Sequence, residues 1–78
     1  MLEIGHEFVR NGKKYIVVDF VNTKAKRYAL LSFNDDEGKI DYEFFELKED
    51  ANGYHFKKVK DDNTVSQLFD KLGGQRNE

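Results

Sequence analysis

The chain of 78 residues contains no cysteine, which excludes disulfide bonds, thiolate metal sites and thiol catalysis. Small secreted domains usually carry disulfides, so their absence favours a reducing compartment. No apolar run approaches the roughly 20 residues that span a bilayer. The first residues, MLEIGHE, lack the basic region and the apolar stretch of a secretory signal. The sequence therefore predicts a soluble, cytoplasmic protein with no membrane partner.

Proline, internal repeats and low-complexity tracts are absent as well. At 9.2 kDa a hydrophobic core barely offsets conformational entropy, so we expect one domain without a large enclosed active site. Seven Phe and four Tyr partly compensate, because each buried ring removes roughly 150–250 Å² from water. We assign residues 1–74 to this domain and residues 75–78 to a polar tail.

Five short apolar and aromatic runs, separated by turn residues, are typical of an antiparallel β-meander. The first turn is the clearest, because Asn11-Gly12 stands between two strand-forming runs and a type I′ turn needs positive φ at both central residues. The second run is apolar on both faces apart from Asp19, which predicts a central strand covered on both sides. The predicted strands are His6–Arg10, Lys13–Val21, Arg27–Phe33, Asp41–Leu47 and Tyr54–Lys60.

The apolar period changes near the C-terminal end, where residues 64–72 are predicted to form a helix. Residues 64–67 are typical of a capping box that starts at Thr64, and Gly73-Gly74 is typical of a helix stop. So short a helix is unstable alone, so we expect it to pack on the sheet. Its apolar stripe consists of Val65, Leu68, Phe69 and Leu72.

The predicted fold class is therefore α+β. It consists of an antiparallel meander of four to five strands, twisted or partly closed, with one C-terminal helix packed on it.

No catalytic or metal-binding motif stands out. The histidines, His6 and His55, lie on different predicted strands, and a shared metal site would need the first and fifth strands to be neighbours. The acidic turn at 34–38 lacks the glycine and the glutamate spacing of a calcium loop. Neither Ser32 nor Ser66 lies in a nucleophile elbow. We therefore expect no enzyme, no metal and no cofactor.

The net charge of −2 hides an uneven distribution. An isoelectric point near 5.7 argues against a dedicated nucleic-acid binder. However, residues 10–27 contain six bases and one acid, whereas residues 35–50 contain eight acids and two lysines. The two stretches therefore suggest partners of opposite charge.

Bases alternate with aromatic residues in the first stretch, the arrangement by which small β-folds hold single-stranded nucleic acid. In the alternative, Tyr15 and Tyr28 form a cross-strand pair and the lysines only solvate turns. The candidate nucleic-acid-binding residues are Arg10, Lys13, Lys14, Tyr15, Lys24, Lys26, Arg27 and Tyr28.

Aromatic residues within the acidic stretch suggest a docking face for a basic protein surface. The same stretch could instead imitate a nucleic-acid backbone, or be a solvated edge hairpin over a core of Phe. The candidate protein-binding residues are Asp35, Asp36, Glu37, Tyr42 and Phe44.

Four segments within residues 7–72 resemble the YrzB-like family of short bacterial proteins, a domain of unknown function. The segments are Gly12–Val18, Arg27–Leu31 with the acidic turn after it, Tyr42–Leu47 and Phe56–Asp62. The resemblance implies a β-meander with a terminal helix and a non-enzymatic role, and it assigns no site residue. Members are more acidic throughout, unlike the basic first half of this chain.

Together these patterns favour a small non-enzymatic protein-interaction or regulatory module, bacterial or phage-borne, which is a monomer or a weak dimer. The alternatives are a single-stranded nucleic-acid binder that uses residues 10–27 and an acidic inhibitor that mimics nucleic acid.

Overall fold

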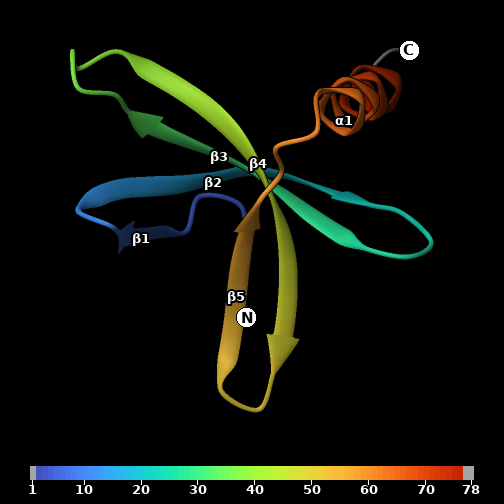
Figure 1. Ribbon diagram of the computed structural model, residues 1–78, viewed down its shortest axis with the longest axis horizontal. Coiled ribbons are helices and arrows are strands. Elements are labelled where there is room, and N and C mark those ends of the chain that lie inside the picture. The colour runs from blue at the N-terminus through green and yellow to red at the C-terminus, as the bar shows by residue number, and fades with distance from the viewer. Residues whose placement is uncertain (1, 77–78) are drawn as a thin grey trace.

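The computed structural model describes residues 2–76, which form a five-stranded antiparallel sheet followed by one helix (Figure 1). The strands pair in chain order, so the predicted meander is confirmed. The elements are β1 (Glu7–Arg10), β2 (Lys13–Asn22), β3 (Arg27–Asn34), β4 (Ile40–Asp50), β5 (Gly53–Lys58) and α1 (Asp62–Arg76).

The turn between β1 and β2 has the predicted conformation. Asn11 has a φ of 55° and Gly12 a φ of 78°. Positive φ at both positions is what a type I′ turn requires, and Asn and Gly adopt it most readily. Arg10 and Lys13 are paired directly across this turn, which thereby sets the register of the first hairpin.

A β-bulge in β2 exchanges the faces to which its residues point. Val17 is paired with Leu31, but the next pair joins Asp19 to Leu30, so Val18 is the extra residue. Residues before and after the bulge therefore alternate in opposite phases. As a result β2 contributes to both core clusters, which confirms the expectation of apolar contacts on both faces.

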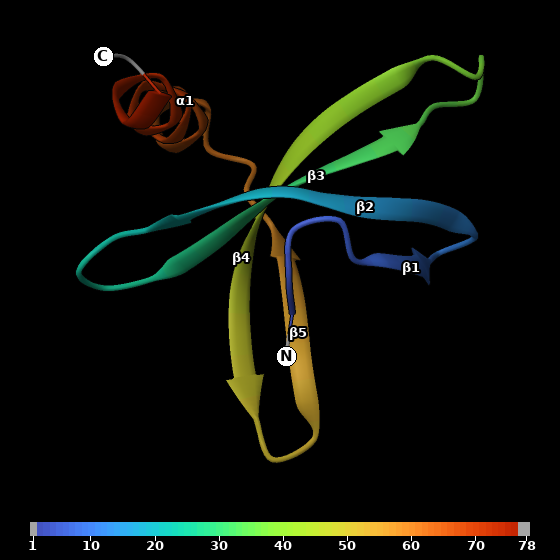
Figure 2. The same ribbon diagram turned by 180° about the vertical axis from the view of Figure 1, so that it is seen from behind.

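The inner core lies within the curl of the sheet, where the two edge strands meet. Phe8 of β1 stacks on Phe56 of β5 with ring centroids 4.9 Å apart. Arg10 Nη2 donates a hydrogen bond to the Phe56 carbonyl oxygen at 3.2 Å. The N-terminal segment runs beside β5 (Figure 2), where the Leu2 amide donates to the Tyr54 hydroxyl at 3.4 Å. The sheet is thus a half-barrel, and its buried inner residues are Tyr15, Val17, Ala29, Leu31, Phe33 and Phe45.

The outer core lies on the opposite face and includes residues of α1. Leu68 and Leu72 are 2% and 7% exposed. Phe69, expected in the same apolar stripe, is 50% exposed, and that expectation is wrong. One residue turns a helix by about 100°, which takes the Phe69 side chain away from the buried side. The sheet residues that share the cluster with Leu68 and Leu72 are Val21, Tyr28, Leu30 and Phe44.

The bounds of α1 differ from the predicted ones at both ends. Asp61, not Thr64, caps the helix: its Oδ2 accepts hydrogen bonds from the Thr64 amide at 3.2 Å and the Thr64 hydroxyl at 2.7 Å. The helix also continues through Gly73-Gly74 to Arg76, so the predicted stop is wrong. Glycine lowers helix propensity by only about 1 kcal/mol and does not end a helix by itself. Residues 77–78 of the predicted tail lie outside the described residues.

Asp61→Ala is expected to lower the thermal unfolding temperature more at neutral pH than in acid. The hydrogen bonds from Thr64 hold the pKa of Asp61 below its ordinary value of 3.8. Stability from a carboxyl group with a lowered pKa is present above the unfolded-state pKa and is lost as the pH falls through the folded-state pKa. Thermal unfolding at about pH 7 and about pH 2 measures this difference. An equal effect at both pH values would contradict a charged cap.

Candidate functional site

The eight residues predicted to bind nucleic acid do not lie together. Three of the bases flank the turn between β1 and β2, and three lie beyond the far end of β2. The ten residues of β2 extend for about 30 Å from one group toward the other. The first group is Arg10, Lys13 and Lys14, and the second is Lys24, Lys26 and Arg27.

The two tyrosines of that set are buried. Tyr15 is 5% exposed in the inner cluster and Tyr28 is 8% exposed in the outer cluster. Because they lie on opposite faces of the sheet, the alternative of a Tyr15–Tyr28 cross-strand pair is also wrong. Tyr15 is paired with Phe33, and Tyr28 with Val21. Neither ring therefore offers a face on which a base could stack.

The first group of bases is engaged within the protein. The Arg10 guanidinium lies 5.3 Å from the centroid of the Phe45 ring. The Lys13 ammonium lies 5.0 Å from the centroid of an aromatic ring of β3. Lys14 Nζ forms an ion pair of 2.9 Å with Glu7 Oε1. Arg10 and Lys14 thus link β1 to other strands, and Lys13 links β2 to β3.

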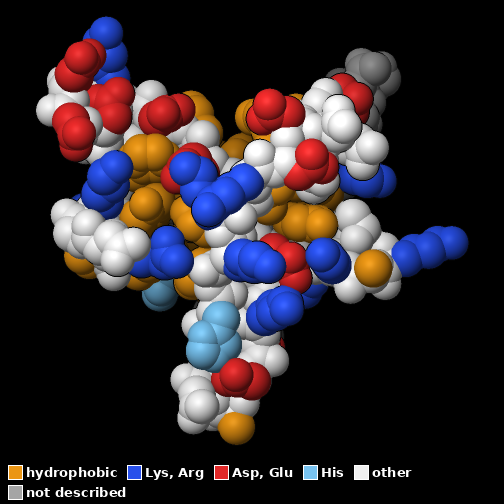
Figure 3. All heavy atoms as spheres, viewed as in Figure 1, with side chains coloured by type: hydrophobic (Ala, Val, Ile, Leu, Met, Phe, Trp, Pro, Cys, Tyr) orange, Lys and Arg blue, Asp and Glu red, His pale blue; other side chains and the backbone are white. Residues whose placement is uncertain are grey.

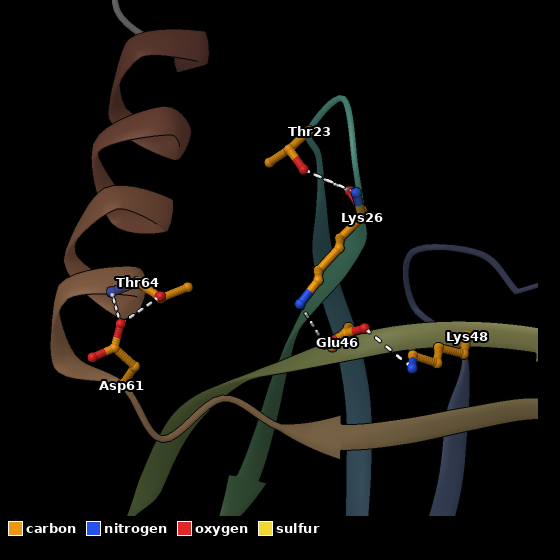
Figure 4. A network of polar contacts seen from close by, with 6 residues as sticks. All are labelled: Thr23, Lys26, Glu46, Lys48, Asp61 and Thr64. Atoms are coloured by element: carbon orange, nitrogen blue, oxygen red, sulfur yellow. Dashed lines mark hydrogen bonds and ion pairs between the residues drawn. The ribbon is translucent and has the colours of Figure 1, made fainter.

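The second group lies close to two further lysines, Lys48 and Lys57, which are not among the predicted site residues. Lys26 and Lys48 approach Glu46 from two sides, with Nζ–Oε distances of 3.4 and 3.7 Å (Figure 4). Lys57 of β5 is the direct cross-strand partner of Glu46. None of the lysines of β5 is among the candidate site residues of the sequence analysis. The register of the β4–β5 hairpin is the signal that could have placed them beside Lys26.

The acidic turn between β3 and β4 is organised by one of its own carboxylates. Asp35 Oδ1 accepts hydrogen bonds from the Glu37 and Lys39 amides, each at 2.9 Å. Asp36 and Glu37 are exposed at the tip, where Glu37 forms an ion pair of 3.7 Å with Lys39. Asp35 therefore stabilises the turn, while the carboxylates of Asp36 and Glu37 are exposed to solvent.

Of the two predicted aromatic contact residues, only Tyr42 is accessible. Tyr42 is 51% exposed, whereas Phe44 is 2% exposed in the outer cluster and is not available to a partner. Strand alternation places Ile40, which is 68% exposed, on the same side of β4 as Tyr42 and Phe44. The ring of Phe69 meets that of Phe44 edge-on at 4.9 Å.

We name the exposed set Ile40, Tyr42 and Phe69 the outer apolar patch. Hydrophobic atoms are visible on both sides of the notch between the β3–β4 hairpin and α1 (Figure 3). Ile40 is missed from the sequence because the fourth strand is predicted to begin one residue later, at Asp41, and Phe69 is missed because its spacing places it in the buried stripe of the helix.

A shallow hollow of about 230 Å³ adjoins the patch on the outer face of the sheet. Ile16 and Ser32 lie in the same cross-strand row as Tyr42, and Ile40 lines the hollow with them. The apolar surface therefore continues from α1 across β4 toward β2.

The two histidines have different neighbours. His55 Nε2 lies 2.9 Å from Asp50 Oδ2. The Asn52 amide, and then His55, hold the pKa of Asp50 below its ordinary value. His6 lies beside Phe8, with ring centroids 6.2 Å apart. Within the part of the chain that the structure describes, no three His, Asp or Glu side chains are grouped so as to hold a metal ion.

In the described chain, no helix has the length and hydropathy needed to cross a membrane. No protein-family model matches the sequence, and neither the curated proteins nor the solved structures contain a match. The resemblance to the YrzB-like family stays a prediction, since nothing in these comparisons bears on it.

Proposed function

We propose that this chain is a small non-enzymatic protein-interaction module, which binds a basic segment of another protein through the outer apolar patch. The observation that carries the proposal is the exposure of Ile40 and Tyr42 side by side on β4, next to the acidic β3–β4 turn. We further propose a regulatory role in the cytoplasm of a bacterium or of a phage-infected cell.

The patch has the composition of a protein-binding surface. Single exposed apolar residues are common on soluble proteins. Here, however, Ile40 and Tyr42 are exposed in one row on β4, and the exposed ring of Phe69 meets Phe44, the next residue of that row. Aromatic and aliphatic anchors surrounded by polar groups are the usual core of a protein interface. The adjoining hollow gives an anchor from the partner a place to enter.

The charge around the patch favours a basic partner. Asp36, Glu37 and Asp41 are exposed at or beside the β3–β4 turn. The nearby bases, Lys14 and Lys39, are both ion-paired within the protein. A negative rim raises the association rate of a positively charged segment and disfavours acidic competitors.

The experiment is affinity capture from a nuclease-treated bacterial lysate, with bound proteins quantified by mass spectrometry. We expect Ile40→Ser with Tyr42→Ala to lower recovery of the captured basic protein about tenfold or more, because interface anchors each contribute about 2 kcal/mol or more. The matched control is Ile4→Ser, since Ile4 is 63% exposed but lies in the N-terminal segment.

Two outcomes would contradict the proposal. Equal loss with Ile4→Ser would show that binding does not depend on the patch. Full retention by the double variant, with loss on Asp36→Asn and Glu37→Gln, would favour the acidic mimic of nucleic acid instead, because a mimic depends on carboxylates rather than on apolar anchors.

A further inference from the structure

A positively charged surface lies at the end of β3 opposite to the outer apolar patch. Two hollows of about 340 and 170 Å³ share Lys26 and Glu46 among their lining residues. The larger lies between the β2–β3 turn and β4, and the smaller extends along β5 to the start of α1. We name six exposed bases of these hollows the basic surface: Lys24, Lys26, Arg27, Lys48, Lys57 and Lys60.

Among the described residues, two carboxylates line the two hollows, and both already have partners within the protein. Glu46 is shared by Lys26 and Lys48, and its side chain is only 12% exposed (Figure 4). Asp61 accepts both hydrogen bonds from Thr64 at the start of α1. Glu46 thus faces two ammonium groups, and Asp61 caps the helix.

The remaining lysines of the basic surface are not neutralised by neighbours. Within the described part of the chain, Lys24, Lys57 and Lys60 form no ion pair. Lys58, a seventh base that lines the smaller hollow, is instead paired: its Nζ lies 2.6 Å from Glu43 Oε2. Three of the bases around these hollows therefore carry a charge that no ion pair within the described chain offsets.

The whole chain divides by charge in the same way. Of its thirteen Lys and Arg and fifteen Asp and Glu, seven bases, Lys58 included, and two acids line the two hollows. The rest of the sequence contains six bases and thirteen acids, so a formal charge of +5 at the hollows is opposed by −7 over the remaining residues. A net charge of −2 therefore does not describe what a partner meets at this surface.

We propose that the basic surface binds the phosphodiester backbone of a nucleic acid. Its bases come from the β2–β3 turn, the β4–β5 hairpin and the segment before α1, so they follow an extended path that suits a linear polyanion. Five of the six are lysines, whose flexible ammonium groups contact phosphates as point charges. Each contact releases condensed counterions, which gives affinity without reading the sequence.

The absence of apolar anchors favours a phosphate backbone over an acidic protein segment. Among the described lining residues, the larger apolar side chains are Leu47 and Tyr28, which are 6% and 8% exposed, and the part-buried Val59. Protein interfaces depend on such anchors, whereas non-specific nucleic-acid binding depends on charge. Because Tyr28 cannot stack a base, contacts are limited to the backbone and show no base preference.

The test is fluorescence anisotropy of a fluorescein-labelled, mixed-sequence single-stranded DNA titrated with the full chain. Binding is expected to weaken about tenfold or more between about 50 mM and about 200 mM salt. Lys57→Glu with Lys60→Glu is expected to weaken it about tenfold or more at low salt. Lys13→Glu with Lys14→Glu makes the same change in net charge at the other end of β2, and is expected to weaken it less than about threefold.

Several results would overturn this proposal: no binding at low salt, binding that does not depend on salt, or equal losses for the two double variants. Competition by poly-L-glutamate as strong as competition by unlabelled DNA would also overturn it and would point to an acidic protein. Ile40→Ser with Tyr42→Ala is expected to retain DNA binding. A negative result for protein binding by the outer apolar patch is therefore distinguishable from a negative result for DNA binding by the basic surface.

Discussion

Phe45→Ala is expected to lower the free energy of unfolding by about 3–5 kcal/mol. Phe45 is 1% exposed at the centre of the inner core. Its ring meets those of Tyr15 and Phe56 edge-on, at centroid distances of 5.8 and 6.3 Å. The Arg10 guanidinium lies 5.3 Å from its centroid. Truncation leaves a cavity between the strands and removes the ring that faces a cation.

Urea unfolding followed by circular dichroism measures this loss. The matched control is Tyr42→Ala on the same strand, which is expected to cost less than about 1 kcal/mol because Tyr42 is half exposed. Phe45→Leu is a milder second variant, expected to cost about 1–1.5 kcal/mol, should the alanine variant not fold. A cost for Phe45→Ala no larger than that of Tyr42→Ala would contradict the half-barrel core.

Leu68→Ala is expected to lower the free energy of unfolding by about 2–5 kcal/mol. Leu68 is 2% exposed in the outer cluster, together with residues of β2, β3 and β4. A helix of fifteen residues is marginal in isolation, so its stability depends on such tertiary contacts. Hydrogen exchange of the α1 amides is expected to accelerate more than exchange in β3, because α1 loses its anchor first.

Phe69→Ala is the neighbouring control for this prediction. Its ring is half exposed and meets Phe44 only edge-on, so the expected cost is about 1 kcal/mol. If Phe69 were a core residue, as its spacing predicts, the cost would be about 3–5 kcal/mol. A larger loss of unfolding free energy for Phe69→Ala than for Leu68→Ala would therefore contradict the observed orientation of α1, in which Leu68 is buried and Phe69 is exposed.

The turns and strands were predictable because their causes are local. Asn11-Gly12 favours positive φ wherever it occurs, and the flanking residues favour strands. The N-terminal end of α1 was less predictable, because both Asp61 and Thr64 are good capping residues. The competition is decided by which backbone amide reaches which side chain, and Asp61 accepts from Thr64.

The bulge at Val18 illustrates why the candidate sites could not be read from alternation. Val17, Val18 and Val21 are chemically alike, so no pattern among them shows where the phase changes. The bulge and the curl decide which rings are buried. They place Tyr15 and Tyr28 in opposite cores, which removes the stacking surface that their spacing with bases had suggested.

By itself the sequence determined the meander, the approximate strands, the single C-terminal helix and the exclusion of disulfide and thiol chemistry. These follow from turn propensity, side-chain period and the absence of cysteine. Only the tertiary structure decided that Phe44 is buried while Ile40 and Phe69 are exposed, and that Lys57 and Lys60 lie beside Lys26. Exposure and charge clustering depend on register, curl and helix rotation, which are set by contacts between residues far apart in the chain.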